Sequence, residues 1–219
     1  MRLRPASILA PILAPILALT PILAAASLVC VGPARAAPAD QPVALPLFGK
    51  TITFRVPPAY TAQPAQLARG QFLLEFLRDG ETFATWRTLL TVRGFQGFGG
   101  IAKATPDLAR AIFEPRACPS GAIFEAAPPE QTAGGMELTY IAIGCADTPA
   151  SAYAQAQAGS GEIDVIALYR DAENLYSVQY AVRGPSFRGD KPPLSLADAR
   201  ATLACTFGPV AIIPTPAAR

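Results

Sequence analysis

The segment from residue 162 to residue 183 places the tightest limit on the fold of this chain. It holds two runs of alternating apolar residues, joined by Asp171-Ala172-Glu173-Asn174, a sequence typical of a turn between strands. If Tyr169 lies opposite Tyr176, the other apolar pairs are Ala167 with Val178, Val165 with Tyr180, and Ile163 with Val182. All eight residues then share one face, because side chains alternate along a strand. The segment therefore predicts an antiparallel hairpin with one apolar face.

Shorter patterns predict the other elements of the fold. Strands are expected at residues 51–56, 71–77, 121–127 and 136–143. Helices are expected over 83–90, from Thr105 to just before Pro115, and from Ser195 to about Thr206. Residues 91–93 end the first helix or begin a strand, and 60–70 read as a loop. Strands and helices that mix without regular alternation predict an α+β fold, an antiparallel sheet with helices packed on it.

The N-terminus has the pattern of a secretory signal peptide. Two arginines among the first four residues precede an uncharged stretch over 5–31, and Ala34-x-Ala36 follows as a small-residue cleavage pattern. We expect cleavage near Ala36 and export to the periplasm or the medium. An uncleaved membrane anchor is the alternative, because the apolar stretch is longer than a usual signal core. Pro11, Pro15 and Pro21 interrupt the stretch and argue against the anchor, since each internal proline removes a helical hydrogen bond.

Removal of a signal peptide at residues 1–36 changes the charge of the chain. The segment carries three arginines and no acid, so a net charge of +2 becomes 15 basic against 16 acidic residues. No basic surface is left to predict nucleic-acid binding, and membrane contact is expected only if the segment stays attached. The remainder divides into an extended lead-in at 37–47, an α+β domain at 48–208 and a loose tail at 209–219.

Three cysteines remain after that cleavage. In an exported chain disulfides persist, and the pair Cys118–Cys145 closes a modest loop in the middle of the domain. Cys205 is then left over, buried on a helix, although its pairing with either of the others stays open. A catalytic thiol is disfavoured, because no histidine is present to activate it and there is no Cys-x-x-Cys.

The full sequence contains no histidine. This excludes a Ser-His-Asp triad, a Cys-His dyad and a metal site built on imidazole. No motif predicts a cofactor or a metal, so none is expected.

One group of candidate residues surrounds the single tryptophan, Trp86. Glu75, Glu81, Arg87 and Arg93 lie near it in the sequence and are candidates for a small polar cleft between the second strand and the first helix. Trp86 is interpreted as a core anchor or as a ligand contact. The alternative for the charged residues is a solvated surface with weak ion pairs.

A second group lies on a Gly-rich segment and at the start of the hairpin. Phe95 and Phe98 belong to Gly94-Phe95-Gln96-Gly97-Phe98-Gly99-Gly100, which matches neither common phosphate-binding motif. We expect these aromatic rings to pack down or to contact a partner. Glu162 and Asp164 share a strand face, where paired carboxylates do acid–base work, bind a cation or are simply solvated.

Two resemblances accompany these patterns. Glu75-Phe76-Leu77-Arg78-Asp79-Gly80-Glu81, followed by Trp86-Arg87-Thr88-Leu89-Leu90-Thr91-Val92, resembles a run in uncharacterised exported bacterial proteins. That resemblance implies export and no particular activity. The order of the predicted elements is similar to the fold of the PsbP and Mog1 group, which implies an antiparallel sheet with helices.

Together these observations predict an exported envelope domain that binds a protein or a small ligand without catalysis. The alternatives are a hydrolase or transferase that acts with carboxylates alone, and a structural or stress-related envelope protein. The first two differ in one geometric respect. If Glu75, Glu81, Glu162 and Asp164 meet in one cleft, the enzyme is favoured; if they scatter, it loses its candidates.

Overall fold

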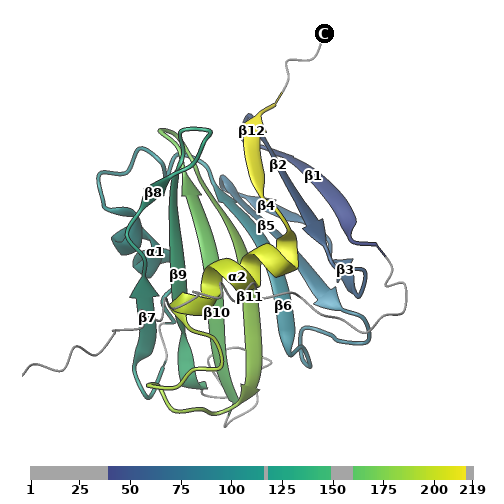
Figure 1. Cartoon of the computed structure of the whole chain (residues 1–219), viewed down its shortest axis with the longest axis vertical. Helices are drawn as coiled ribbons and strands as arrows, with labels where there is room; N and C mark the ends of the chain where they lie inside the picture. Colours follow the sequence, from purple (N-terminus) through teal and green to yellow (C-terminus); the bar gives the residue numbers. More distant parts are fainter. Residues whose placement is uncertain (1–38, 116–117, 149–159, 216–219) are drawn as a thin grey trace, which may run out of the picture. The chain divides into compact units, whose positions relative to one another are not determined.

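The structure is a computed structural model that describes residues 39–115, 118–148 and 160–215. These residues form two antiparallel sheets and two helices, as the α+β prediction requires (Figure 1). The proposed signal segment, 1–36, lies outside the described residues. In the part that the structure describes, no helix is long and apolar enough to cross a membrane.

The larger sheet has nine strands in the order β3-β5-β6-β11-β10-β9-β7, with β4 paired to β5 and β8 to β9. Its strands are β3 (Tyr60–Ala62), β4 (Gln66–Ala68), β5 (Gln71–Arg78), β6 (Thr88–Phe95), β7 (Ala122–Ala126), β8 (Glu130–Gln131), β9 (Glu137–Thr148), β10 (Ser160–Arg170) and β11 (Leu175–Pro185).

The predicted hairpin is confirmed in its register. Strands β10 and β11 pair with Tyr169 opposite Tyr176 and Ile163 opposite Val182. The turn forms where expected, because the Asp171 carboxylate accepts a hydrogen bond of 2.7 Å from the Asn174 backbone N–H. The hairpin lies at the centre of the sheet, since β11 pairs with β6 and β10 pairs with β9.

A smaller sheet contains β1 (Gln41–Leu47), β2 (Lys50–Val56) and β12 (Ala211–Pro214), with β2 in the middle. The expected lead-in at 37–47 therefore contains a strand, and so does the expected loose tail at 209–219. Both segments contain prolines, which argue against a strand in a sequence pattern. They are tolerated here because β1 and β12 are edge strands, in which one side of the backbone needs no partner.

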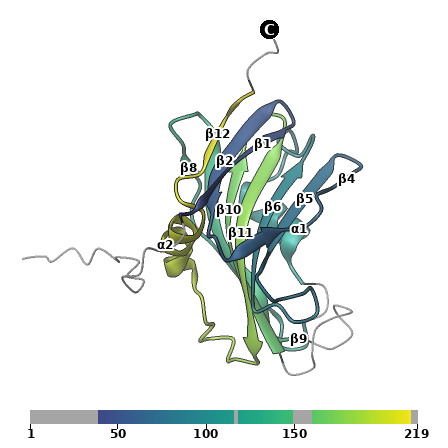
Figure 2. The ribbon, with the colours of Figure 1, turned by 90° about the vertical axis from the view of Figure 1, so that its right-hand side faces the viewer.

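The main core lies between the two sheets and beneath helix α2 (Leu196–Phe207). Phe54 of β2 joins all three parts, since its ring centroid is 6.0 Å from that of Phe76 in β5 and 5.8 Å from that of Phe207 in α2. A separate apolar cluster packs helix α1 (Thr105–Phe113) against the opposite face of the larger sheet. Figure 2 shows the two helices on opposite sides of that sheet.

The helix expected over 83–90 does not form. Residues 82–85 make a turn in which the Trp86 N–H donates to the Thr82 carbonyl, and β6 begins at Thr88. β6 pairs on both sides, with β5 and β11, and both of its faces are largely covered. A strand covered on both faces loses its alternating pattern, which is why its apolar residues resembled a helix. The expected loop at 60–70 likewise contains the short strands β3 and β4.

The other two helices form close to their predicted bounds. α1 starts with Pro106 in its first turn, but its N-cap residue is Ala104 rather than Thr105. The Thr105 hydroxyl instead donates a hydrogen bond to the Glu137 carboxylate. At the start of α2, the Asp198 carboxylate accepts a bond of 3.0 Å from the Ser195 backbone N–H, half of the predicted capping box.

The predicted disulfide is present between Cys118 and Cys145. It ties the connection after α1 to β9, and the chain-entropy model assigns such a loop roughly 3–4 kcal/mol of stabilisation. Cys205 lies on α2 as expected, but it is exposed rather than buried. Among the described residues no cysteine is free, so Cys205 is not the leftover thiol that the sequence suggested.

Arg170, at the end of β10, holds the Gly-rich segment in place. Its guanidinium donates to the carbonyls of Gly99 (2.8 and 3.0 Å), Ile101 (2.5 Å) and Lys103 (2.7 Å). Gly99 itself packs against the hairpin turn, where an added Cβ would lie 2.3 Å from the Asp171 carbonyl oxygen. Only glycine fits this contact. The segment is therefore fixed by its carbonyl oxygens and is not arranged as a phosphate-binding loop.

Replacement of Arg170 by Met is expected to lower the free energy of unfolding by about 3 kcal/mol, because several carbonyls lose a charged donor at once. Chemical denaturation measures the loss. Arg188→Met is the matched control, since Arg188 contacts Asp190 in an exposed ion pair and its removal should cost less than about 1 kcal/mol. Equal losses in the two variants would contradict the clamping role of Arg170.

Candidate functional site

The face of the larger sheet that α1 covers is not apolar throughout. α1 packs near β9, and beyond it the same face carries polar residues in register across neighbouring strands. Glu75 in β5 lies opposite Thr91 in β6, which in turn lies opposite Gln179 in β11. Because alternate residues share a face, Arg93, Arg183 and the β10 acids belong to the same surface.

Apart from Asp164, these residues line a cleft of about 350 Å³. Its walls combine aromatic, charged and amide side chains from four strands and from the turn before β6. The lining residues are Glu75, Phe83, Trp86, Leu89, Thr91, Arg93, Glu162, Gln179, Ala181 and Arg183.

Arg183 organises one side of the cleft. Its Nε and Nη2 atoms donate to the same Glu162 carboxylate oxygen, at 3.1 and 2.8 Å. Its guanidinium carbon also lies 3.8 Å from the centre of the Trp86 ring, a cation–π contact. Trp86 is only 5% exposed. The indole is thus both a core side chain and the surface on which the Arg183–Glu162 pair rests.

Asp164 lies beside this pair on β10, opposite Ala181 of β11. Burial, followed by the neighbouring Glu162 charge, raises the pKa of Asp164 to about 8; the Gln179 side chain and the charges of Arg93 and Arg183 oppose the rise. Its Oδ1 atom is buried without a hydrogen-bond partner. At neutral pH this carboxyl is therefore mostly protonated.

The opposite side of the cleft holds Glu75 and Arg93. Burial raises the pKa of Glu75, and the Arg93 charge lowers it by a smaller amount. Neither side chain makes an ion pair with a described residue. The Arg93 guanidinium is 5.6 Å from the ring centre of Phe113, the last residue of α1.

Several buried polar atoms of the cleft and its floor have no hydrogen-bond partner among the described residues. They comprise donors and acceptors from three of the four strands, β6, β10 and β11, namely Thr91 Oγ1, Arg93 Nε, Asp164 Oδ1, Gln179 Oε1 and Arg183 Nη1. A buried polar group without a partner costs about 1–3 kcal/mol, so such groups are uncommon in folded proteins. Their convergence marks this surface as a candidate binding site.

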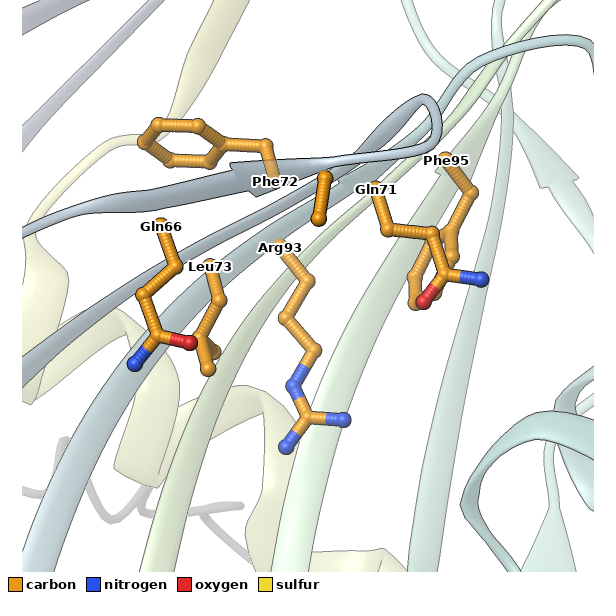
Figure 3. Close-up of a pocket in the computed structure, with 7 residues that line it drawn as sticks. Gln66, Gln71, Phe72, Leu73, Arg93 and Phe95 are labelled. Atoms are coloured by element: carbon orange, nitrogen blue, oxygen red, sulfur yellow. The ribbon is translucent and has the colours of Figure 1, made fainter.

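A second hollow of about 210 Å³ adjoins the cleft along β5 and β6. Arg93 lines both, and it extends from β6 on the same side of the sheet as Leu73 (Figure 3). Phe72 points to the other side of β5, toward the main core. Leu73 and Phe95 provide apolar surface in this hollow.

The structure brings together part of the site that the sequence suggested. Glu75, Trp86 and Glu162 line one cleft, and Asp164 lies beside it. Glu81 does not line it; its charge acts on Tyr60 and Tyr180 instead. Three of the four acids therefore meet, which keeps a carboxylate enzyme among the candidate functions.

The remaining candidates take other positions. Arg87 is exposed and does not line the cleft. Phe95 is buried, packs 5.4 Å from Phe98 and 6.0 Å from Phe113 between ring centres, and reaches the second hollow. Packing, the first of the two interpretations, accounts for the contacts of both phenylalanines.

Sequence reasoning missed Phe83, Thr91, Gln179 and Arg183 as cleft residues. For Arg183 a signal was present, because the predicted register of the hairpin already places Arg183 opposite Glu162. Thr91 and Gln179 become neighbours only through the pairing of β6 with β11. No sequence pattern indicated that pairing.

Comparison with known proteins adds no identification, since no family model and no curated protein matches the chain. The resemblances drawn from the sequence stay predictions. Within the described ranges, no group of three or more His, Cys, Asp or Glu residues is placed to hold a metal ion.

Asp164→Asn is expected to flatten the dependence of stability on pH. A carboxyl whose pKa rises on folding stabilises the fold below its unfolded pKa, near 4, and loses that contribution as the pH rises toward about 8. In this window the free energy of unfolding of the wild type should fall by up to about 1.4 kcal/mol per pH unit because of Asp164 alone. The asparagine variant should lack this slope and be more stable above pH 7. Urea denaturation from pH 4 to 9 measures it.

The exposed Asp40 provides the control. Asp40→Asn should give a curve parallel to that of the wild type. A parallel curve for Asp164→Asn as well would contradict the raised pKa.

Proposed function

We propose that this chain is an exported domain of the cell envelope that binds a small polar ligand in the Trp86 cleft without transforming it. The observation that carries the proposal is the set of unpartnered polar atoms on a concave surface beside an aromatic wall. Ligand sites generally combine an apolar lining with a few placed polar groups, and this cleft has both.

The energetics support a bound ligand. Thr91 is fully buried, and its hydroxyl has no partner among the described residues. Valine has nearly the same shape and would avoid the cost of desolvating the hydroxyl. A side chain that lowers stability in this way is explained if it makes a hydrogen bond with a ligand.

The charges favour binding over catalysis. Glu162 is neutralised by two hydrogen bonds from Arg183, and the unpartnered oxygen of Asp164 is buried. A general base needs a carboxylate within hydrogen-bond reach of substrate. In this arrangement Glu75 is the acid on the cleft wall without an ion pair to a described residue.

A hydrolase or transferase that uses carboxylates is the second candidate. The convergence of Glu75, Glu162 and Asp164, with a raised pKa on Asp164, favours it. Mass spectrometry of a bound compound after prolonged incubation separates the two functions. A ligand recovered unchanged supports binding, whereas a product that the Glu75→Gln variant does not form supports catalysis.

Export is supported by the charge pattern of residues 1–36 and by the Cys118–Cys145 bond, which persists in oxidising compartments. We expect the intact mass of protein recovered from a periplasmic fraction to place the N-terminus near residue 37. Met1 at the N-terminus of that protein would contradict cleavage.

Ligand binding is expected to change the fluorescence of Trp86, which is the only tryptophan in the chain. The purified protein is titrated with amino acids, dipeptides, monosaccharides, nucleosides and dicarboxylic acids. At least one class should shift the emission saturably. Thr91→Val should weaken that affinity about tenfold, or 1.4 kcal/mol, and raise the free energy of unfolding by about 1 kcal/mol.

Thr139→Val is the matched control. Thr139 is also fully buried with an unpartnered hydroxyl, but it does not line the cleft. The Thr139→Val substitution should therefore stabilise the protein and leave ligand affinity unchanged. The proposal fails if no compound in the panel binds, or if both valine variants alter affinity equally.

A further inference from the structure

The junction between the cleft and the second hollow is formed by Arg93, which lines both. Its guanidinium extends away from β6 into the space bordered by Gln66, Leu73 and Phe95 (Figure 3). Its Nε atom is buried without a hydrogen-bond partner, and the side chain forms no ion pair with any residue that the structure describes; it contacts the Phe113 ring at 5.6 Å. A half-buried guanidinium in this state is suited to an anionic group, above all a carboxylate, which it can bind through two parallel donors.

Glu75 supplies the opposite charge in the same cleft. It lies on β5, which pairs with β6, the strand of Arg93. Arg93 lies opposite Leu73, and Glu75 is the next residue after Leu73 on the same face of β5. Arg93 acts on Glu75 through its charge, but the two side chains form no ion pair. Each therefore has its charged group available to a ligand that carries the complementary charge.

The other charged groups of the cleft are already balanced. Arg183 and Glu162 neutralise each other at 2.8 Å, and Asp164 is mostly protonated at neutral pH. Among the charged lining residues that the structure describes, this leaves one cation, Arg93, and one anion, Glu75. A cation and an anion held apart on one wall match a ligand that carries both charges on neighbouring atoms.

The hollow beyond Arg93 accommodates an apolar group. Leu73 and Phe95 provide apolar surface there, and Gln66 and Gln71 provide amide groups at its opening. Its volume of about 210 Å³ is below the usual range for drug-sized ligands, and this size suits one side chain rather than a whole molecule.

We propose, on the basis of the small-ligand function above, that the cleft binds a free α-amino acid with an apolar side chain. Its carboxylate contacts Arg93, its ammonium group contacts Glu75, and its side chain occupies the hollow at Leu73 and Phe95. Thr91 and Gln179 complete the hydrogen bonds of the bound backbone atoms.

The test compares three ligands that share the leucine side chain, by calorimetry and by Trp86 fluorescence. L-Leucine carries both charges, L-leucinamide lacks the carboxylate, and N-acetyl-L-leucine lacks the ammonium group. We expect leucine to bind at least tenfold more tightly than either derivative. Arg93→Gln should abolish the preference for leucine over leucinamide, and Glu75→Gln should abolish the preference over N-acetyl-leucine.

Arg87→Gln is the control variant, because Arg87 is an exposed arginine near Trp86 that does not line the cleft. It should bind the three ligands as the wild type does. Far-ultraviolet circular dichroism checks the folding of each variant. The ligand comparison on the wild-type protein needs no variant and stays decisive if one of them misfolds.

The outcomes separate this inference from the proposed function. Equal affinity for the three leucine compounds, or no binding of leucine while a sugar or a nucleoside shifts the Trp86 emission, overturns the amino-acid ligand and leaves small-ligand binding in place. If nothing in the wider panel binds, both proposals fall.

Discussion

A nine-stranded sheet has two broad faces that must be covered. The described elements outside this sheet are one three-stranded sheet and two helices. One face packs against the three-stranded sheet and α2, which meet at Phe54. Among the residues that the structure describes, the other face receives α1 and the segments beside it. Where that cover ends, the strands carry Glu75, Thr91 and Gln179 on this face instead of apolar residues. The cleft is thus a consequence of incomplete coverage, and its polar lining keeps the open surface compatible with water.

The balance of charge within the cleft depends on Arg183. This side chain neutralises Glu162 and at the same time stacks on Trp86, so the turn before β6 and the central hairpin are held together. A neutralised Glu162 also limits the repulsion that Asp164 experiences in its buried position. The balanced pair makes the two remaining charges, on Arg93 and Glu75, the natural determinants of what the cleft accepts.

Local sequence signals were sufficient for the elements whose neighbours are close in the chain. The register of the β10–β11 hairpin and the starts of α1 and α2 follow from alternation and from turn and cap residues. β6 was misassigned because the burial of its two faces depends on elements from distant parts of the chain, among them β2, α2 and α1, which no local pattern contains. The same limit applies to the site. The proximity of Trp86 to Glu75 was predictable from the sequence order, whereas Gln179 reaches Thr91 only through the pairing of β11 with β6.

The order of the strands has a consequence for the time at which the fold can be completed. β2, near the start of the domain, pairs with β12, which lies within the last ten residues that the structure describes. The small sheet, and with it the closure of the main core over Phe54, can therefore form only after β12 has been synthesised. Pairings of such long range also slow folding, because loop entropy must be lost before the contact forms. The three-stranded sheet is therefore completed only after every strand of the larger sheet is already available.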